Sequence, residues 1–165
     1  MSSPYSPLPE EIRRAKWPHE IFLINLVFNH IFLFATTFGN YSTFPWMVML
    51  VPGISLAITL YIFVKARYVA KSDDSLLIKA HWASAERRNR QFVALLLLAG
   101  FVLGGGYLLG SALGWTRITM LATLGGFGLL PFMVAVLVLV VMGNFAMYEA
   151  RHHKFPKGFQ PPATL

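Results

Sequence analysis

Residues 92–113 read FVALLLLAGFVLGGGYLLGSAL, a run of 22 residues without a charged side chain. As an α-helix this run would rise about 33 Å, which is enough to cross the hydrocarbon core of a bilayer. The basic run Arg87-Arg88-Asn89-Arg90 stands directly before it, as is typical of a helix end that meets lipid headgroups. The sequence therefore predicts a transmembrane helix here.

Three more apolar runs of membrane-spanning length flank this one, and the short uncharged or nearly uncharged loops between them predict two tight hairpins. The expected spans lie at about 21–38, 46–64, 92–113 and 118–147. The expected organisation is an all-α membrane protein with a cytoplasmic N-terminal segment at 1–20, a four-helix transmembrane domain at 21–147 and a cytoplasmic tail at 148–165. The first third of the fourth span contains Gly125, Gly126, Gly128 and Pro131, which predicts a kink, a tilt, or a first turn that stands outside the lipid.

The loop between spans two and three predicts an additional helix. Residues 74–90 contain neither glycine nor proline, and Ser72-Asp73-Asp74 offers an N-cap. We expect a cytoplasmic amphipathic helix at about 74–90. It either lies on the membrane surface or runs directly into span three, and the pattern leaves both arrangements open.

The composition agrees with a membrane protein. The chain of 165 residues is 56% hydrophobic and 13% charged, about half the charged fraction of a typical soluble domain. The formal net charge of +7 would suggest nucleic acid in a soluble protein, but here the basic residues flank apolar runs, so we expect no nucleic-acid partner. The absence of cysteine excludes disulfides, thiolate zinc sites and iron–sulfur clusters.

The distribution of Lys and Arg predicts the orientation. Thirteen of these residues fall before span one, between spans two and three, or after span four, whereas Arg117 alone falls in an opposite loop. By the positive-inside rule both termini and the central loop are cytoplasmic. This topology and the lack of cysteine are typical of a multi-pass protein of the plasma membrane, in particular of a bacterial inner membrane.

A ladder of small residues marks span three. It comprises Gly100, Gly104, Gly106, Gly110 and Gly114, whose spacings include three GxxxG pairs. Between helices in lipid, close backbone contact is favourable and small residues permit it. The ladder predicts either an interface with another subunit or intramolecular packing against span four, and the sequence leaves both open.

Polar side chains within the spans form a second candidate site. The predicted intramembrane polar face comprises Asn25, Asn29, His30, Ser55 and Asn144, and Thr36 is expected to extend the face of Asn25 and Asn29. Such groups are costly in lipid, so they should face protein or water. Two interpretations remain: hydrogen bonds between helices in a dry interior, or a hydrated path for a small solute or ion.

Neither catalysis nor a metal or cofactor site is expected. No Asp or Glu lies inside a predicted span, and the chain has no Walker, GxSxG or HExxH motif. Glu149 and His152 have the Glu-x-x-His spacing of di-metal bundles, but this chain has a single such pair at a predicted membrane edge. We therefore expect no metal ligand and no cofactor.

These observations favour a small, non-catalytic integral membrane subunit or accessory protein. It would assemble through its glycine-lined helices with copies of itself or with a larger membrane complex, and the lipid bilayer would be its other partner. The alternative function is a homo-oligomeric channel or transporter for a small solute or ion, lined by the polar face.

Overall fold

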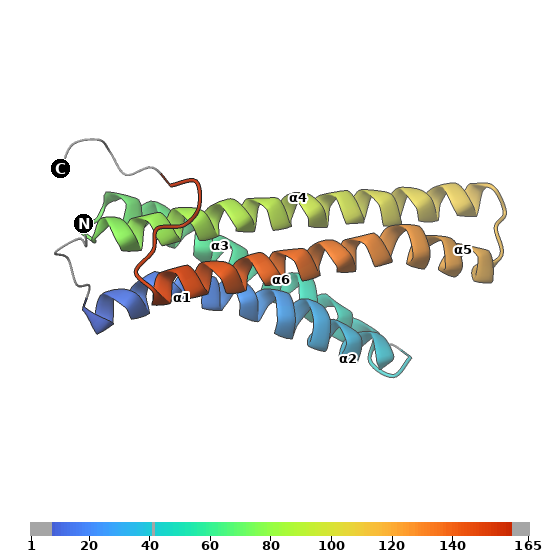
Figure 1. The fold of residues 1–165 in the computed structure, drawn as a ribbon. Coiled ribbons are helices and arrows are strands. Elements are labelled where there is room, and N and C mark those ends of the chain that lie inside the picture. The colour runs from blue at the N-terminus through green and yellow to red at the C-terminus, as the bar shows by residue number, and fades with distance from the viewer. Residues whose placement is uncertain (1–7, 41, 160–165) are drawn as a thin grey trace. The chain divides into compact units, whose positions relative to one another are not determined.

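The computed structural model describes residues 8–40 and 42–159, and every regular element among them is helical. In chain order the elements are α1 (Pro9–Ile24), η1 (Asn25–Leu33), α2 (Phe34–Gly39), η2 (Pro45–Met49), α3 (Leu50–Lys71), α4 (Leu76–Ala112), α5 (Arg117–Thr123), η3 (Leu124–Leu129) and α6 (Leu130–Arg151). The α-helices are labelled in Figure 1. Elements η1 and η3 are π-helical and η2 is a 3₁₀-helix. The predicted all-α class is confirmed.

Four continuous helical segments are long and apolar enough to cross a membrane: Pro9–Thr37, Pro45–Lys71, Leu76–Ala112 and Arg117–Arg151. The sequence expectation of four such helices is confirmed. In their most apolar windows at most 33% of the residues are buried within the protein, so most of the apolar surface faces outward. A water-soluble protein would hide such a surface, whereas acyl chains can cover it.

The region between the second and third apolar runs is part of one long helix. Helix α3 ends at Lys71, where the Ser72 hydroxyl donates to the Val69 carbonyl at 2.8 Å. Helix α4 begins at Leu76, with the Ile78 amide donating to Ser75 Oγ at 3.5 Å, and continues without a break to Ala112. The helix expected over 74–90 thus begins two residues later and runs directly into the third apolar run.

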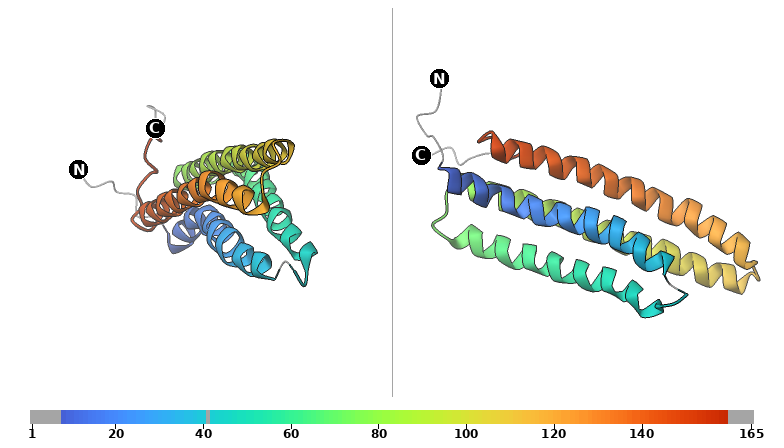
Figure 2. Two further views of the ribbon diagram at one scale, coloured as in Figure 1. Left: turned by 90° about the vertical axis from the view of Figure 1, so that its right-hand side faces the viewer. Right: turned by 90° about the horizontal axis from the view of Figure 1, so that it is seen from below.

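The described chain divides into two compact units, one formed by residues 1–89 and 140–165 and the other by residues 90–139. In the first unit α3 runs back alongside α1 and η1, as Figure 2 shows in its right-hand view. Helix η1 packs on α3 by its polar side, while Phe28 and Phe32 remain more than half exposed. The polar side chains of η1 are therefore turned toward α3.

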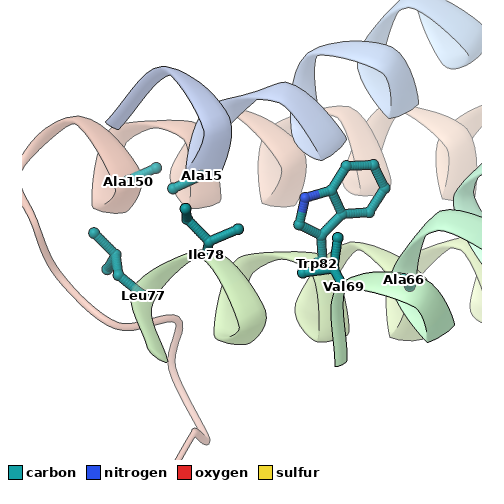
Figure 3. Close-up of a cluster of buried hydrophobic side chains, with 7 residues drawn as sticks. All are labelled: Ala15, Ala66, Val69, Leu77, Ile78, Trp82 and Ala150. Atoms are coloured by element: carbon teal, nitrogen blue, oxygen red, sulfur yellow. The ribbon is translucent and has the colours of Figure 1, made fainter. Parts of the chain in front are cut away.

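A cluster of buried side chains joins four helices of this unit (Figure 3). Its members are Ala15 of α1, Ala66 and Val69 of α3, Leu77, Ile78 and Trp82 of α4, and Ala150 of α6. Alanines allow the backbones to approach closely, and Trp82, which is 3% exposed, fills the remaining space. The Trp82 ring meets Tyr61 edge to face, with ring centroids 6.3 Å apart.

The second unit contains the turn from α4 to α5 and the π-helix η3. Gly114 has a positive φ of 68°, and the Thr116 hydroxyl caps α5 by accepting from the Thr119 amide at 3.2 Å. Helix η3 lies directly before Pro131, which has no amide hydrogen and crowds the preceding turn. The glycine-rich first third of the fourth apolar segment therefore widens into a π-helix.

Candidate functional site

The polar side chains of η1 form a hydrogen-bonded cluster with α3. Asn29 Nδ2 donates to Asn25 Oδ1 at 3.0 Å and to the carbonyl oxygen of Val51 at 2.9 Å. Asn25 Nδ2 donates to Ser55 Oγ at 3.4 Å, and His30 Nδ1 donates to the carbonyl oxygen of Asn25 at 3.0 Å. Four of the five residues predicted as the intramembrane polar face are thus brought together.

This cluster is closed to solvent within the chain. Asn25 is fully buried, and Asn29, His30 and Ser55 are 4%, 6% and 3% exposed. Asn29 Oδ1 is a buried acceptor for which the described residues provide no donor. The cluster can therefore hold two helices together as it stands, and it has one acceptor to which a water molecule or a polar solute could donate.

The π-helical conformation of η1 changes which threonine continues the buried face. The sequence expectation placed Thr36 with Asn25 and Asn29 on a regular α-helix. The structure instead leaves Thr36 exposed, with its hydroxyl donating to the Phe32 carbonyl at 2.9 Å, and fully buries Thr37. Because a π-helix bonds residue i to residue i+5, it rotates all following side chains relative to an α-helix.

Asn144 lies apart from this cluster. It is exposed on α6, and its Nδ2 donates to the carbonyl oxygen of Val140 one turn earlier in the same helix, at 3.1 Å. The α6 face that packs inward carries Gly143 instead, where an added Cβ would lie 2.8 Å from the Leu23 side chain. Asn144 therefore requires a separate explanation.

Asn89 makes a second polar link that the sequence interpretation missed. It is fully buried in α4, and its Nδ2 donates to the Thr59 carbonyl oxygen at 3.2 Å while its Oδ1 accepts from the Thr59 hydroxyl at 3.4 Å. The signal was present in the spacing, because Ile78, Trp82, Ala85, Asn89 and Phe92 recur every three or four residues and all are buried. The charged neighbours of Asn89 obscured this pattern.

A third polar group joins α1, α4 and the segment after α6. His19 and His81 are fully buried, with His19 Nε2 and His81 Nδ1 3.0 Å apart. His81 Nε2 lies 3.1 Å from the carbonyl oxygen of Lys154, and Nη1 of Arg88 lies 3.5 Å from His19 Nδ1. The sequence interpretation missed His81, which shares the buried face of α4.

One arrangement of protons satisfies all three of these contacts. A carbonyl can only accept, so His81 Nε2 carries a proton, and a guanidinium can only donate, so His19 Nδ1 is unprotonated. His19 Nε2 must then carry its proton and donate to His81 Nδ1. The result is a directed chain from Arg88 through two neutral imidazoles to the Lys154 carbonyl, which we call the histidine chain.

Of the Glu-x-x-His pair, Glu149 lies in α6 and His152 is the first residue after that helix. Glu149 is buried, whereas His152 is exposed, donates from Nδ1 to the Tyr148 carbonyl at 2.9 Å and stacks on the Tyr148 ring at 4.0 Å. Among residues 8–40 and 42–159, no three His, Cys, Asp or Glu side chains gather closely enough to hold a metal ion. The described side chains thus provide no set of metal ligands around Glu149 and His152.

The glycine ladder of α4 separates into two parts. An added Cβ at Gly106 would lie 2.6 Å from Leu124 Cδ2, and one at Gly110 would lie 2.8 Å from the Trp115 ring, so these two glycines accommodate neighbours within the second unit. At Gly100 and Gly104 an added Cβ meets nothing within 4 Å, and the same holds for Gly114 at the turn. The ladder is therefore partly an internal packing device and partly an uncovered surface.

By their length and composition the four apolar helices, with polar side chains bonded to one another between them, indicate a multi-pass membrane protein. Comparison with protein-family models, with curated proteins and with solved structures finds no match at the levels searched.

Proposed function

We propose that this chain is a small, non-catalytic integral membrane subunit that assembles through the uncovered glycines of α4 with itself or with a larger membrane complex. Its four helices would cross a plasma membrane, such as a bacterial inner membrane, as two hairpins. Both termini would lie in the cytoplasm, together with the amphipathic first half of α4. The thirteen-to-one distribution of Lys and Arg supports this orientation.

Reporter fusions test the orientation. A periplasmic reporter fused after Asn40 or after Trp115 should be active, and a cytoplasmic reporter should be active after Ser72 and at the C-terminus. The reason is that basic residues next to apolar segments are retained on the cytoplasmic side. An active periplasmic reporter at Ser72 would contradict the proposed topology.

The observation that carries the proposed function is the open backbone surface at Gly100 and Gly104. These glycines are four residues apart on one helix face, and apart from the local chain of α4 itself nothing in the second unit lies within 4 Å of a Cβ built at either position. The apolar window of α4 is also the least buried of the four, at 6%. A second helix could approach this surface closely, and small residues at such contacts are the usual basis of helix association in lipid.

Gly104→Leu should reduce assembly while leaving the fold intact, because the new side chain extends from an open surface and prevents close approach of a partner helix. The measurement is gentle extraction from the native membrane, followed by quantification of co-purifying protein and of oligomer size. Parent protein should retain a stoichiometric partner or a self-oligomer, and Gly104→Leu should lose most of it.

Leu97→Ile is the matched control, since Leu97 is 70% exposed on the same helix and the change conserves volume. Gly106→Leu and Gly110→Leu should instead lower the stability of the monomer, because their neighbours belong to the same chain. If Gly104→Leu assembles as fully as the parent protein, this surface faces lipid and the proposal is refuted.

The alternative function, a channel or transporter lined by the polar face, has one observation in its favour. Asn29 Oδ1 is a buried acceptor without a donor from the described residues, as would be expected beside a path for water or a polar solute. The direct hydrogen bonds that close the rest of the cluster favour the structural interpretation.

A further inference from the structure

Asn144 is a polar side chain on an outward-facing apolar surface of α6. It is exposed, and three neighbours on the same side, Val141, Phe145 and Tyr148, are 51%, 62% and 51% exposed. Asn144 lies in the last part of the fourth apolar segment, before the first charged residue of that segment's end, Glu149. An amide at this position would meet acyl chains if nothing else covered it.

The hydrogen bonds within the chain leave this amide incompletely satisfied. One amide hydrogen is used by the Val140 carbonyl, at 3.1 Å. An Asn amide has a second hydrogen and an oxygen that accepts two bonds, and no partner within the described residues is found for these. In hydrocarbon there is no water to supply the missing bonds, so an outward Asn is costly unless a partner helix provides them.

Helix α6 has a well-packed inner face, and Asn144 lies on the opposite side of the helix. Gly143, Ala146 and Ala150 form that inner face, with Ala146 and Ala150 fully buried and Gly143 close to Leu23. The outer residues Val141, Asn144 and Tyr148 repeat the same spacing of three and four residues. This is the spacing at which one helix presents a continuous seam to another.

We propose that the outer seam of α6 pairs with the same seam of a second copy of this chain, and that the two Asn144 amides bond to each other. The partner follows from the chemistry of the amide, which carries both a donor and an acceptor and is therefore complementary to itself. In a two-fold symmetric pair each residue near the axis faces its own copy, so each Asn144 supplies the bond that the other lacks. A single Asn in an apolar seam is also a known means of fixing helix register and number.

This inference rests on the proposed placement of the chain in a membrane, and it names the partner that the proposed function leaves open. It concerns a different surface from Gly100 and Gly104. Self-pairing through α6 and assembly through Gly100 and Gly104 can therefore be supported or refuted separately.

Cysteine cross-linking of the full chain in lipid vesicles tests the inference, and the chain is naturally free of cysteine. Asn144→Cys and Tyr148→Cys should each form a disulfide-linked dimer on mild oxidation, because each position would face its own copy. Val64→Cys is the matched control: Val64 is 68% exposed, and it lies seven residues before the end of α3, as Asn144 does before the end of α6. It should remain a monomer.

Dimerisation in vesicles, measured by energy transfer between labelled copies as the protein is diluted with lipid, provides a second readout. Asn144→Leu should dissociate at about tenfold higher protein density than the parent, and Asn144→Gln, which keeps the amide, should remain closer to the parent. Leu at this position removes a polar group from an apolar surface, so loss of folding would not explain the change.

Cross-links at positions 144 and 148 together with weaker pairing of Asn144→Leu would support the inference. A monomer at all densities would overturn it and leave the seam to lipid, and capture of a different membrane protein by α6 without self-pairing would overturn it as well. If Asn144 variants pair normally while Gly104→Leu loses its partner, the inference fails and the proposed function stands. If copies cross-link through α6 while Gly104→Leu has no effect, the inference stands and the proposed assembly through Gly100 and Gly104 fails.

Discussion

His81→Leu is expected to lower the free energy of unfolding by roughly 1 to 3 kcal/mol, because it leaves the buried His19 Nε2 without an acceptor and also removes a bond to the Lys154 carbonyl. His19 Nε2 would lose its acceptor at 3.0 Å, and the Lys154 carbonyl oxygen would lose its donor at 3.1 Å. Both histidines are fully buried, so solvent does not replace the bond between them. Unfolding of the purified protein, followed by loss of helical signal in mixed micelles, provides the measurement.

His153→Asn is the control, since His153 is exposed, Asn tolerates the positive φ of 56° at this position, and the change should alter stability by less than about 0.5 kcal/mol. In a double-mutant cycle His19→Leu and His81→Leu should be coupled by about 0.5 to 3 kcal/mol, because each removes the partner of the other. Strictly additive effects would show that the two imidazoles do not exchange a hydrogen bond, and the histidine chain would then be wrong.

The segment after α6 should respond to the same variant. His153 has a positive φ of 56°, after which Pro156 is buried and the Phe155 and Phe159 rings stack at 5.5 Å. Since the Lys154 carbonyl is tied to α4 through His81, release of this bond should expose the segment to limited proteolysis. This accompanying readout distinguishes a local release from a general loss of stability.

Ser55→Cys is expected to remain unlabelled by a small water-soluble thiol reagent, whereas Thr43→Cys should react fully. Ser55 is 3% exposed and accepts from Asn25 within the cluster, while Thr43 is exposed in the loop between α2 and η2. Cysteine is close to serine in size, so the substitution disturbs the packing little. The measurement is the rate of thiol modification in intact membranes of this naturally cysteine-free chain.

This experiment separates the two candidate functions. Protection of Ser55→Cys, and likewise of Asn29→Cys, would leave a channel without a path along the polar face and would support a dry, structural cluster. Labelling at both positions would show that water reaches the cluster, and the unpartnered Asn29 Oδ1 would then be interpreted as part of a solute path. That result would favour the transport function over the proposed function as a non-catalytic subunit.

Several features of the protein could be predicted from the sequence because they depend on local composition. Membrane-length apolar runs specify spanning helices regardless of what packs beside them, since every backbone group in lipid must be bonded within its own segment. The four helices that are long and apolar enough to cross a membrane follow from this rule. The absence of glycine and proline from residues 76–90 likewise indicated a helix, and α4 contains it.

The tertiary structure decided which polar groups meet. A π-helix inserted at Asn25–Leu33 exchanged Thr36 for Thr37 on the buried face, and no periodicity rule for an α-helix anticipates that shift. The spacing of the buried residues of α4 indicates which face Asn89 shares, but the partners that His81 and Asn89 meet, His19 and Thr59, lie 62 and 30 residues away in the chain. Partners at such distances leave no local trace in the sequence.

The same distinction holds for the glycine ladder and for Asn144. The sequence determined that α4 carries small residues at helical spacing and that α6 carries an amide within an apolar run. The packing of Leu124 and Trp115 decided that Gly106 and Gly110 are internal while Gly100 and Gly104 are open, and the packing of Gly143 on Leu23 decided that Asn144 faces outward. The physical reason is that a helix fixes the spacing of its side chains by itself, whereas the face that becomes buried depends on the neighbours that approach it.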